Sequence, residues 1–472
     1  MNKRFSSLTE IQKEISVSGL TVPEIVNYYL SQIEKWKHLN AFLEVFDQES
    51  IAAANTVQKK IESGTAGKLA GMVIAIKDNI VYKDHASSAS SKILDNFKSL
   101  FSATAVERLL AEDAIIIGRT NCDEFAMGSS NENSAFGPVL NALDTERVPG
   151  GSSGGSAVAV QADMCLASLG SDTGGSIRQP AAFTGLYGIY PTYGSISRWG
   201  LIAFASSFDQ IGPFTSSVSD MALILNIIAG KDDRDASMYQ REATPIQLNR
   251  ENKKLKIAYI KDCLEHPGLD PHIKASSEKM IETLKNNGHS VDGIEFPYLD
   301  QMVPCYQVLT TAEASSNLSR FSGLTYGYRS ANAYDLESTF KKSRSEGFGP
   351  EVKRRIMLGT FVLTSDFYDA YYTKAQKVRQ LIRTKTLQIF EDYDVILTPT
   401  TSTPAFKLGE KASNPIALYL ADLFTVQSNL AGNPALSIPF GSHPENGMPI
   451  GMQLMGNLFS EETLLNLASE FN

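Results

Sequence analysis

The sequence predicts an α/β fold, in which strands and helices alternate along the chain and pack in layers. An apolar run over residues 71–79, which contains Lys77 near its end, is typical of a buried strand that delivers a lysine to one edge of a sheet. A helical pattern around residues 106–110 and an apolar segment at 114–118 follow it. This alternation of strand and helix indicates an α/β layered fold.

The other elements are expected from capping signals and apolar periodicity. Ser7 with Glu10, and Thr21 with Glu24, have the spacing of a capping box and predict two helices at the start of the chain. The later elements are expected to be a helix at 217–230, a strand at 255–261, a helix at 276–285, a strand at 289–296, strands at 395–397 and 436–438, and a helix at 464–471.

Size and composition are those of a soluble globular protein. The chain has 472 residues, of which 43% are hydrophobic and 20% charged. No apolar run reaches the roughly 18–20 residues of a membrane span. No apolar core follows the basic residues Lys3 and Arg4, so a signal peptide is not expected. We therefore expect a cytoplasmic protein that does not enter the membrane.

Cysteine spacing and net charge argue against two kinds of site. The four cysteines are widely separated and form no CxxC pair, which favours free thiols in a reducing compartment and no zinc or other metal site. The net charge of −9 gives the chain no electrostatic basis for binding nucleic acid by itself. If RNA takes part in the function, another subunit is expected to hold most of it.

Two turns rich in glycine and serine, at residues 150–156 and 171–176, are the main functional signal. The apolar segments between them, at 157–160 and 166–169, suit a buried helix and a strand, so the stretch is a poor flexible linker. Neither turn has the spacing of a phosphate-binding loop. Glycine lets the backbone take φ > 0 and approach a ligand closely, so such turns present N–H groups and a hydroxyl at one point. A catalytic serine loop is the remaining interpretation.

A catalytic serine needs a base that takes its proton. None of the six histidines lies in a glycine-rich turn, and His85, the best placed of them, is expected to be a solvated loop residue. This counts against a Ser-His-Asp triad without excluding it. Lys77 is the other candidate, because burial disfavours the ammonium form and can leave a lysine neutral enough to act as a base. Taken alone, a lysine that closes a strand is more commonly a surface residue.

Together, the Lys77 strand, the Gly-Gly-Ser-Ser-Gly-Gly-Ser turn at 150–156 and the Gly-Ser-Asp-Thr-Gly-Gly-Ser-Ile-Arg-Gln-Pro segment at 170–180 resemble the amidase signature family. The triad of that family is Ser-cis-Ser-Lys, with the cis-serine 24 residues before the nucleophile, and Ser152 and Ser176 have this spacing. The resemblance therefore implies that Ser176 is the nucleophile, Ser152 the bridging serine and Lys77 the base.

The resemblance also implies an architecture and supporting roles. It implies one domain over residues 1–472, with a central mixed β-sheet covered by helices on both faces, a signature core at about 65–235 and substrate-pocket segments at about 300–440. The peptide before Ser152 is expected to be cis, and Ser153 and Arg178 are expected to support the site without reacting. The N–H groups expected to form the oxyanion hole are those of Thr173, Gly174, Gly175 and Ser176.

Nearly the whole chain is similar to one branch of this family, the glutamine-hydrolysing A subunits of tRNA-dependent amidotransferases. By this likeness Arg355 would hold the α-carboxylate of glutamine and Asp422 its α-ammonium, which agrees with the need for a forked cation and a separate anion. Helical facing favours Arg355, with Arg354 as the alternative. Other residues expected in the substrate site are Tyr306, Gly128 and Ser129. Without the resemblance, Glu124 would be an ordinary surface carboxylate.

The likeness implies an enzyme that hydrolyses glutamine through an acyl-enzyme and supplies ammonia to a partner. The partner would amidate Glu-tRNA(Gln), or Asp-tRNA(Asn), in a complex with B and C subunits and would hold most of the aminoacyl-tRNA. ATP and Mg²⁺ would belong to that partner, because this chain has no phosphate loop, and no cofactor is expected here. The alternatives are a stand-alone amidase that hydrolyses small amides and a non-catalytic scaffold subunit.

Overall fold

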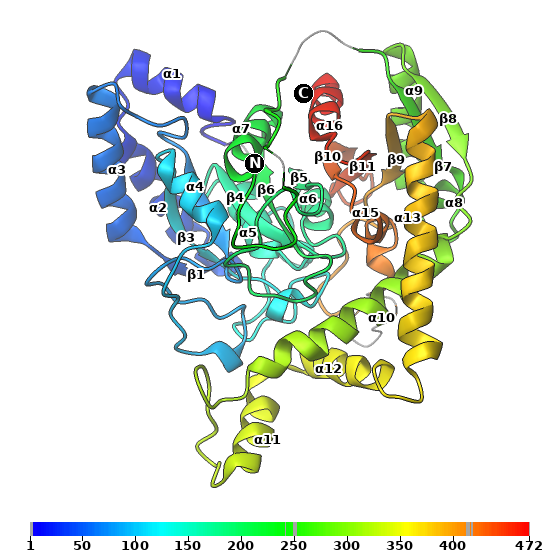
Figure 1. The fold of residues 1–472 in the computed structure, drawn as a ribbon. Helices are drawn as coiled ribbons and strands as arrows, with labels where there is room; N and C mark the ends of the chain where they lie inside the picture. The colour runs from blue at the N-terminus through cyan, green and yellow to red at the C-terminus, as the bar shows by residue number, and fades with distance from the viewer. Residues whose placement is uncertain (1–2, 241, 249–252, 412–415, 417–418, 472) are drawn as a thin grey trace.

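The computed structural model describes residues 3–240, 242–248, 253–411, 416 and 419–471. In this part of the chain, eleven strands form one sheet in the order β1-β3-β2-β4-β6-β5-β10-β11-β9-β7-β8 (Figure 1). The strands are β1 (Phe42–Val45), β2 (Val73–Lys77), β3 (Ile115–Thr120), β4 (Ala167–Asp172), β5 (Tyr187–Tyr190), β6 (Gln210–Thr215), β7 (Lys256–Ile260), β8 (Ser290–Ile294), β9 (Val395–Pro399), β10 (Ala435–Ser442) and β11 (Pro449–Gly456).

The sheet contains both parallel and antiparallel pairs. β2 runs parallel to β3 and β4, and β7 runs parallel to β8 and β9. Between these two groups, β10 pairs antiparallel with β5 and β11. The sheet is therefore mixed, as the family resemblance implies.

Helices cover both faces of the sheet. Alternate residues of a strand point to opposite faces, and along β9 Val395 and Leu397 pack into one hydrophobic core whereas Ile396 packs into another. This confirms the predicted fold class.

No helix in the described ranges is both long and apolar enough to cross a membrane. The helices are α1 (Leu8–Ser18), α2 (Val22–Lys35), α3 (Asp47–Glu62), α4 (Thr104–Ala111), α5 (Gly154–Gln161), α6 (Arg178–Thr184), α7 (Val218–Ile228), α8 (Lys261–Leu264), α9 (Pro271–Asn286), α10 (Leu299–Asn317), α11 (Leu336–Gly347), α12 (Pro350–Val362), α13 (Lys374–Asp392), α15 (Val426–Ala431) and α16 (Glu461–Ala468).

The first half of the chain folds largely as its local signals predict. The Ser7 side chain caps α1 by accepting a hydrogen bond from the Glu10 N–H, and Thr21 and Glu24 form a complete capping box on α2. All five residues of β2 are buried, because parallel strands flank it on both sides and helices cover its faces. This burial carries Lys77, the last residue of β2, into the interior.

Several elements have no counterpart among the sequence-based expectations. β5 is only four residues long, and β11 contains Pro449 and Gly451, residue types that usually mark turns or sheet edges. Gly451 is required there because a Cβ would lie 2.4 Å from the Cβ of Ala182 on α6. Helix α10 continues through Pro304. In each case tertiary packing overrides a local preference.

The two glycine-rich turns lie against each other beside β2. The first precedes α5, and the second connects β4 to α6. The Ser153 N–H donates to the Ser176 carbonyl at 3.2 Å, which joins the turns directly. Serines that are far apart in the sequence are thereby brought to the lysine at the end of the neighbouring strand.

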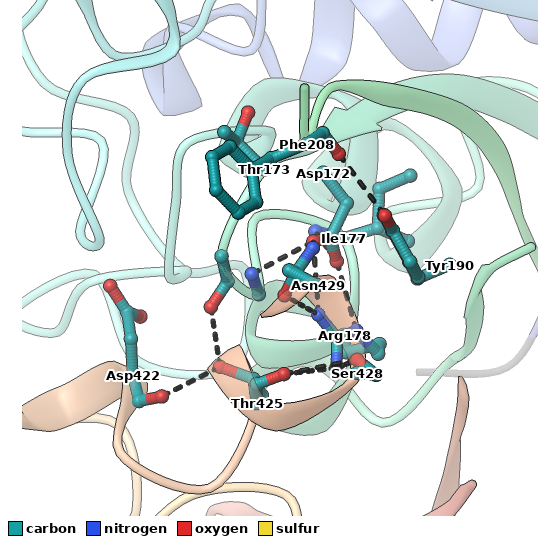
Figure 2. A network of polar contacts seen from close by, with 12 residues as sticks. Asp172, Thr173, Ile177, Arg178, Tyr190, Phe208, Asp422, Thr425, Ser428 and Asn429 are labelled. Atoms are coloured by element: carbon teal, nitrogen blue, oxygen red, sulfur yellow. Dashed lines mark hydrogen bonds and ion pairs between the residues drawn. The ribbon is translucent and has the colours of Figure 1, made fainter. Parts of the chain in front are cut away.

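A buried ion pair ties the second turn to the other half of the sheet (Figure 2). Arg178 Nε and Nη2 donate to the two carboxylate oxygens of Asp172, each at 3.0 Å, and both side chains are fully buried. Arg178 Nη1 also donates to the Thr425 carbonyl, to Ser428 Oγ and to Gln453 Oε1, at 2.6–2.7 Å. The guanidinium therefore links β4, α6, α15 and β11.

Replacing Arg178 with leucine is expected to lower the free energy of unfolding by about 3–5 kcal/mol, because it leaves a buried carboxylate without its counter-charge. Urea denaturation followed by circular dichroism measures this change. Lys341→Met is the matched control, since the Lys341 side chain is 74% exposed and its ion pair within the described residues is with Glu337, one turn away. A loss below about 1 kcal/mol for the Arg178 variant, the size of an ordinary surface pair, contradicts the prediction.

Candidate active site

Lys77 is fully buried at the end of β2 and is surrounded by hydroxyl groups. Its Nζ lies 2.7 Å from Ser152 Oγ, 2.9 Å from Ser153 Oγ and 2.9 Å from Ser171 Oγ. No carboxylate forms an ion pair with it in the described chain. The surface-lysine interpretation of Lys77 is therefore wrong.

The protons of these hydroxyls are not equally available to Lys77. Ser153 Oγ donates its proton to the Ser171 carbonyl at 3.0 Å, and Ser171 Oγ accepts from Asn79 Nδ2 at 2.9 Å as well as from Lys77. Ser152 Oγ has no other hydrogen-bond partner among the described residues. A neutral lysine can therefore accept a proton from Ser152, while Ser153 and Ser171 hold the amine in position.

Burial lowers the pKa of Lys77 to about 8. The charges of Asp123, Asp172 and Asp209 act in the opposite direction, but they do not offset the loss of hydration. A substantial fraction of the lysine is then neutral at slightly alkaline pH. This is the protonation state that a general base requires.

Asp123 supports the turn that carries Ser152, a role that the sequence analysis did not assign. The peptide bond between Gly151 and Ser152 is cis, as the resemblance implies. A Cβ on Gly151 would lie 2.2 Å from Asp123 Oδ2, and this carboxylate accepts hydrogen bonds from the Asn131 and Asn133 N–H groups. The only signal in the sequence is an acidic residue shortly after a buried strand.

Ser176 lies two residues before α6 and makes no side-chain hydrogen bond in the described chain. It is 8% exposed, whereas Ser152 is 0% exposed, so of the two hydroxyls that of Ser176 is the more accessible. Its carbonyl is held by the Ser153 N–H. The structure thus places the expected nucleophile on the accessible side of the Lys77–Ser152 pair.

The second turn differs from expectation at Gly175. The N–H of Gly175 donates to Asp172 Oδ1 at 2.8 Å, so it is already used and is not free for an oxyanion. The N–H groups of Thr173, Gly174 and Ser176 have no backbone partner in the described chain. Thr173 contributes its hydroxyl elsewhere, donating to Asp209 at 2.6 Å.

Neighbouring side chains explain why this turn needs two glycines. A Cβ on Gly174 would lie 2.5 Å from the Tyr306 hydroxyl, and a Cβ on Gly175 would lie 2.3 Å from Thr425 Oγ1. Gly175 also has φ of +133°, which side chains disfavour. Tyr306 is therefore in direct contact with the turn that carries Ser176.

Of the two candidate arginines, only Arg355 is buried. Arg355 is 3% exposed, whereas the side chain of Arg354 is 42% exposed and lies at the surface of α12. Arg355 Nε donates to Glu351 at 2.8 Å, and its guanidinium lies 5.4 Å from the ring centroids of Phe204 and Tyr419. Its Nη1 and Nη2 have no hydrogen bond among the described residues. A pair of parallel donors is therefore free for a carboxylate.

Asp422 provides the opposite charge next to this arginine. Ser129 Oγ donates to Asp422 Oδ2 at 2.6 Å, and the Asp422 carbonyl accepts a hydrogen bond from Thr425 Oγ1 (Figure 2). Burial raises the pKa of Asp422 to about 7, with the Ser129 bond and the Arg355 charge acting in the opposite direction. Gly128, also expected in the substrate site, packs on Asp123, where a Cβ would lie 2.3 Å from the carboxylate carbon.

Two expectations about other residues are wrong. Glu124 is 2% exposed and is not a surface carboxylate: it accepts hydrogen bonds from Ser91 and from the Gly349 N–H at the start of α12. Burial raises its pKa to about 7. His85 is not solvated either, since its ring stacks on Tyr82 with 4.2 Å between centroids and its side chain is 11% exposed.

One group of potential metal ligands occurs in the described residues, and it does not include the triad. His272, His443 and Glu445 each offer one ligand atom within 4.8 Å of the others. They belong to α9 and to the turn between β10 and β11, whereas Lys77 is on β2 and Ser152 and Ser176 lie in the turns before α5 and α6.

Comparison with known proteins agrees with this geometry. The sequence model of the amidase family matches residues 24–465. The A subunit of the Glutamyl-tRNA(Gln) amidotransferase from Chlorobaculum parvum is 47% identical over 468 residues, which cover 98% of this chain and 97% of the relative. The crystal structure of the protein of that name from Thermotoga maritima is 38% identical, with a TM-score of 0.76, and the match covers 95% of this chain and 93% of that one.

The fold is also shared by an amidase with another substrate. The native peptide amidase of Stenotrophomonas maltophilia has a TM-score of 0.81 at 27% identity, over 98% of this chain and 96% of that chain. The fold therefore does not distinguish the activities within this group, whereas sequence identity does separate the relatives. The family match and the 47% identity over nearly the whole length show that this chain belongs to the amidase signature family.

Proposed function

We propose that this chain hydrolyses glutamine as the A subunit of a tRNA-dependent amidotransferase. The observation that carries the proposal is a buried Arg355, whose Nη edge has no hydrogen bond in the described chain, together with the half-buried carboxylate of Asp422, whose pKa responds to the Arg355 charge. Asp422 lies close to the turn that holds Ser176, since Thr425 Oγ1 donates to the carbonyls of both Asp422 and Gly174. A cation and a separate anion fit a zwitterionic amino acid, whereas a simple amide would use neither. The names of the relatives at 47% identity support the same assignment.

The reaction starts with proton transfer along the serines. Neutral Lys77 accepts the proton of Ser152, which in turn accepts the proton of Ser176 as its oxygen attacks the amide carbon of glutamine. The N–H groups of Thr173, Gly174 and Ser176 donate to the oxyanion that forms. Collapse of the tetrahedral intermediate breaks the C–N bond, with a proton returned to the nitrogen, and leaves ammonia and a glutamyl ester on Ser176. Water, activated by the same serines and lysine, then releases glutamate.

The ammonia would pass to a partner that amidates Glu-tRNA(Gln) or Asp-tRNA(Asn). We assign ATP, Mg²⁺ and most of the aminoacyl-tRNA to B and C subunits in a cytoplasmic heterotrimer, because the sequence has no phosphate-binding loop and carries a net charge of −9. We propose no cofactor for this chain, because the serines, the lysine and the backbone donors would supply the groups that the glutaminase step requires.

The function is tested by purifying the chain from its own cells with whatever remains bound. Glutamate release from glutamine is then measured with and without ATP and glutamyl-tRNA. Release that depends on the co-purified subunits and rises with ATP and tRNA supports the proposal. Hydrolysis by the lone chain that does not change with ATP or glutamyl-tRNA and is faster on other amides identifies a stand-alone amidase. Glutaminase activity of the assembly that survives Ser176→Ala identifies a scaffold.

Substitution of Lys77 by alanine is expected to lower kcat for glutamine by about 10²–10⁴-fold, the usual contribution of a general base. In the unsubstituted enzyme kcat/KM should rise with pH through about 8, because the neutral form of Lys77 is the active one. Stopped assays of glutamate from pH 6 to 9.5 measure both effects. The matched control is Lys68→Ala, an exposed lysine at the surface before β2. A profile that is flat from pH 7 to 9 contradicts the assignment of the base.

Asp422 is expected to add a second dependence on pH. Its raised pKa of about 7 means that it gains a proton as the pH falls through 7 and can then no longer pair with the substrate ammonium. The decline of kcat/KM below pH 7 should therefore be steeper for glutamine than the loss of neutral Lys77 alone produces. In Asp422→Asn the extra steepness should disappear and KM should rise. Equal slopes in the two enzymes contradict this role.

A further inference from the structure

The guanidinium of Arg355 is held in one orientation by groups that no substrate contact explains. Its Nε donates to Glu351 Oε1 at 2.8 Å, and the aromatic rings of Phe204 and Tyr419 each lie 5.4 Å from its central carbon. These contacts use the Nε side and place two aromatic rings near the guanidinium. They leave the Nη1–Nη2 edge, the edge that binds a carboxylate with two parallel hydrogen bonds.

The Glu351 side chain is itself held in place by hydrogen bonds, so it can hold the Arg355 guanidinium in one orientation. It is 6% exposed, and its Oε1 also accepts a hydrogen bond from the Tyr419 hydroxyl at 2.9 Å. Its Oε2 accepts from Arg354 Nη1, one helical turn away. Both carboxylate oxygens are therefore engaged, and the side chain has no freedom to follow a moving guanidinium. Glu351 lies in the first turn of α12, four residues before Arg355, which is the spacing at which helical side chains meet.

The charge balance around Arg355 depends on the same residue. Burial alone would lower the pKa of Arg355, and the Glu351 carboxylate, acting with Tyr419 and Tyr306, more than offsets this effect, so that the pKa lies above its usual range. In the absence of substrate, Glu351 compensates the charge of this buried arginine. A long side chain without such a partner would sample several rotamers inside the pocket, and few of them would present the Nη edge to the substrate.

We propose that Glu351 is a positioning residue: together with the Tyr419 hydroxyl, it fixes the Nη edge of Arg355 toward the pocket and so gives the site its preference for amides that carry an α-carboxylate. This inference rests on the proposed function. Glu351 does not touch the substrate or the reacting atoms, and it acts through Arg355. There are two competing explanations: Glu351 only anchors the first turn of α12, or it only compensates the charge of Arg355.

The experiment compares two substrates in the complete assembly as purified. Glutamine and 4-aminobutanamide have the same amide and the same amine, but 4-aminobutanamide lacks the α-carboxylate. Glu351→Ala is expected to raise KM for glutamine by up to about 10²-fold, the effect of a misplaced binding group, with a much smaller change in kcat. It should leave kcat/KM for 4-aminobutanamide unchanged, because that substrate does not use Arg355. An equal loss on both substrates overturns the proposal.

Further variants separate position, charge and stability. Glu351→Gln keeps an oxygen that accepts from Arg355 Nε and Tyr419, so it should restore most of the affinity for glutamine; if it is as impaired as Glu351→Ala, the charge is what matters and the positioning role is wrong. Lys353→Ala removes a neighbouring cation of α12 that donates to the Ser345 carbonyl and not to Glu351, and is the matched control with little expected effect. If Glu351→Ala does not fold, Tyr419→Phe takes its place and should raise KM for glutamine alone.

Arg355→Ala makes the two possible failures distinguishable. If that variant hydrolyses glutamine normally, the carboxylate site of the proposed function is wrong. If it loses glutamine affinity while Glu351→Ala and Tyr419→Phe, with unchanged melting temperatures, do not, the carboxylate site stands and only the role of Glu351 is overturned.

Discussion

The buried ion pair between Arg178 and Asp172 is the interaction on which the rest of the site depends. Asp172 uses one carboxylate oxygen for the Gly175 N–H and the other for the Ile177 N–H, so it shapes the turn from both sides of Ser176. Burial alone would raise the pKa of Asp172, and the charge of Arg178 more than offsets this, so that the carboxylate stays ionised. Without that counter-charge a carboxylate in this position would be protonated, and the turn would lose its acceptor.

Burial has the opposite consequence for Lys77, which lies on the neighbouring strand. Arg178 is surrounded by acceptors and a full negative charge, whereas Lys77 is surrounded by hydroxyl groups and forms no ion pair in the described chain. A buried cation with a counter-charge stays charged, and one without it loses its proton more easily. A structural cation on α6 and the proposed base on β2 therefore differ in the set of partners around each.

Much of the fold followed from local pattern, and the exceptions share a cause. Three features were predictable because each depends on neighbours in sequence: the helix caps at Ser7 and Thr21, the buried strand β2, and the alternation of strand and helix around β3 and β4. β11 was not, since Pro449 and Gly451 suggest a turn. The glycine is needed in this strand because Ala182 packs closely against it. The sequence context of Glu124 predicts a surface residue, because the groups that donate hydrogen bonds to its carboxylate, Ser91 and the Gly349 N–H, come from distant segments.

The sequence by itself determined the residue types proposed for the triad, their spacing along the chain and the family to which the chain belongs, because motifs and identity to relatives are read without coordinates. Only the tertiary structure decided which groups are free to act. It buried Arg355 and left Arg354 at the surface, and it gave the Gly175 N–H to Asp172. The burial of Arg355 depends on distant segments that carry Phe204 and Tyr419, and the conformation that brings the Gly175 N–H to Asp172 depends on the packing of Thr425 against the turn, so no local pattern encodes either.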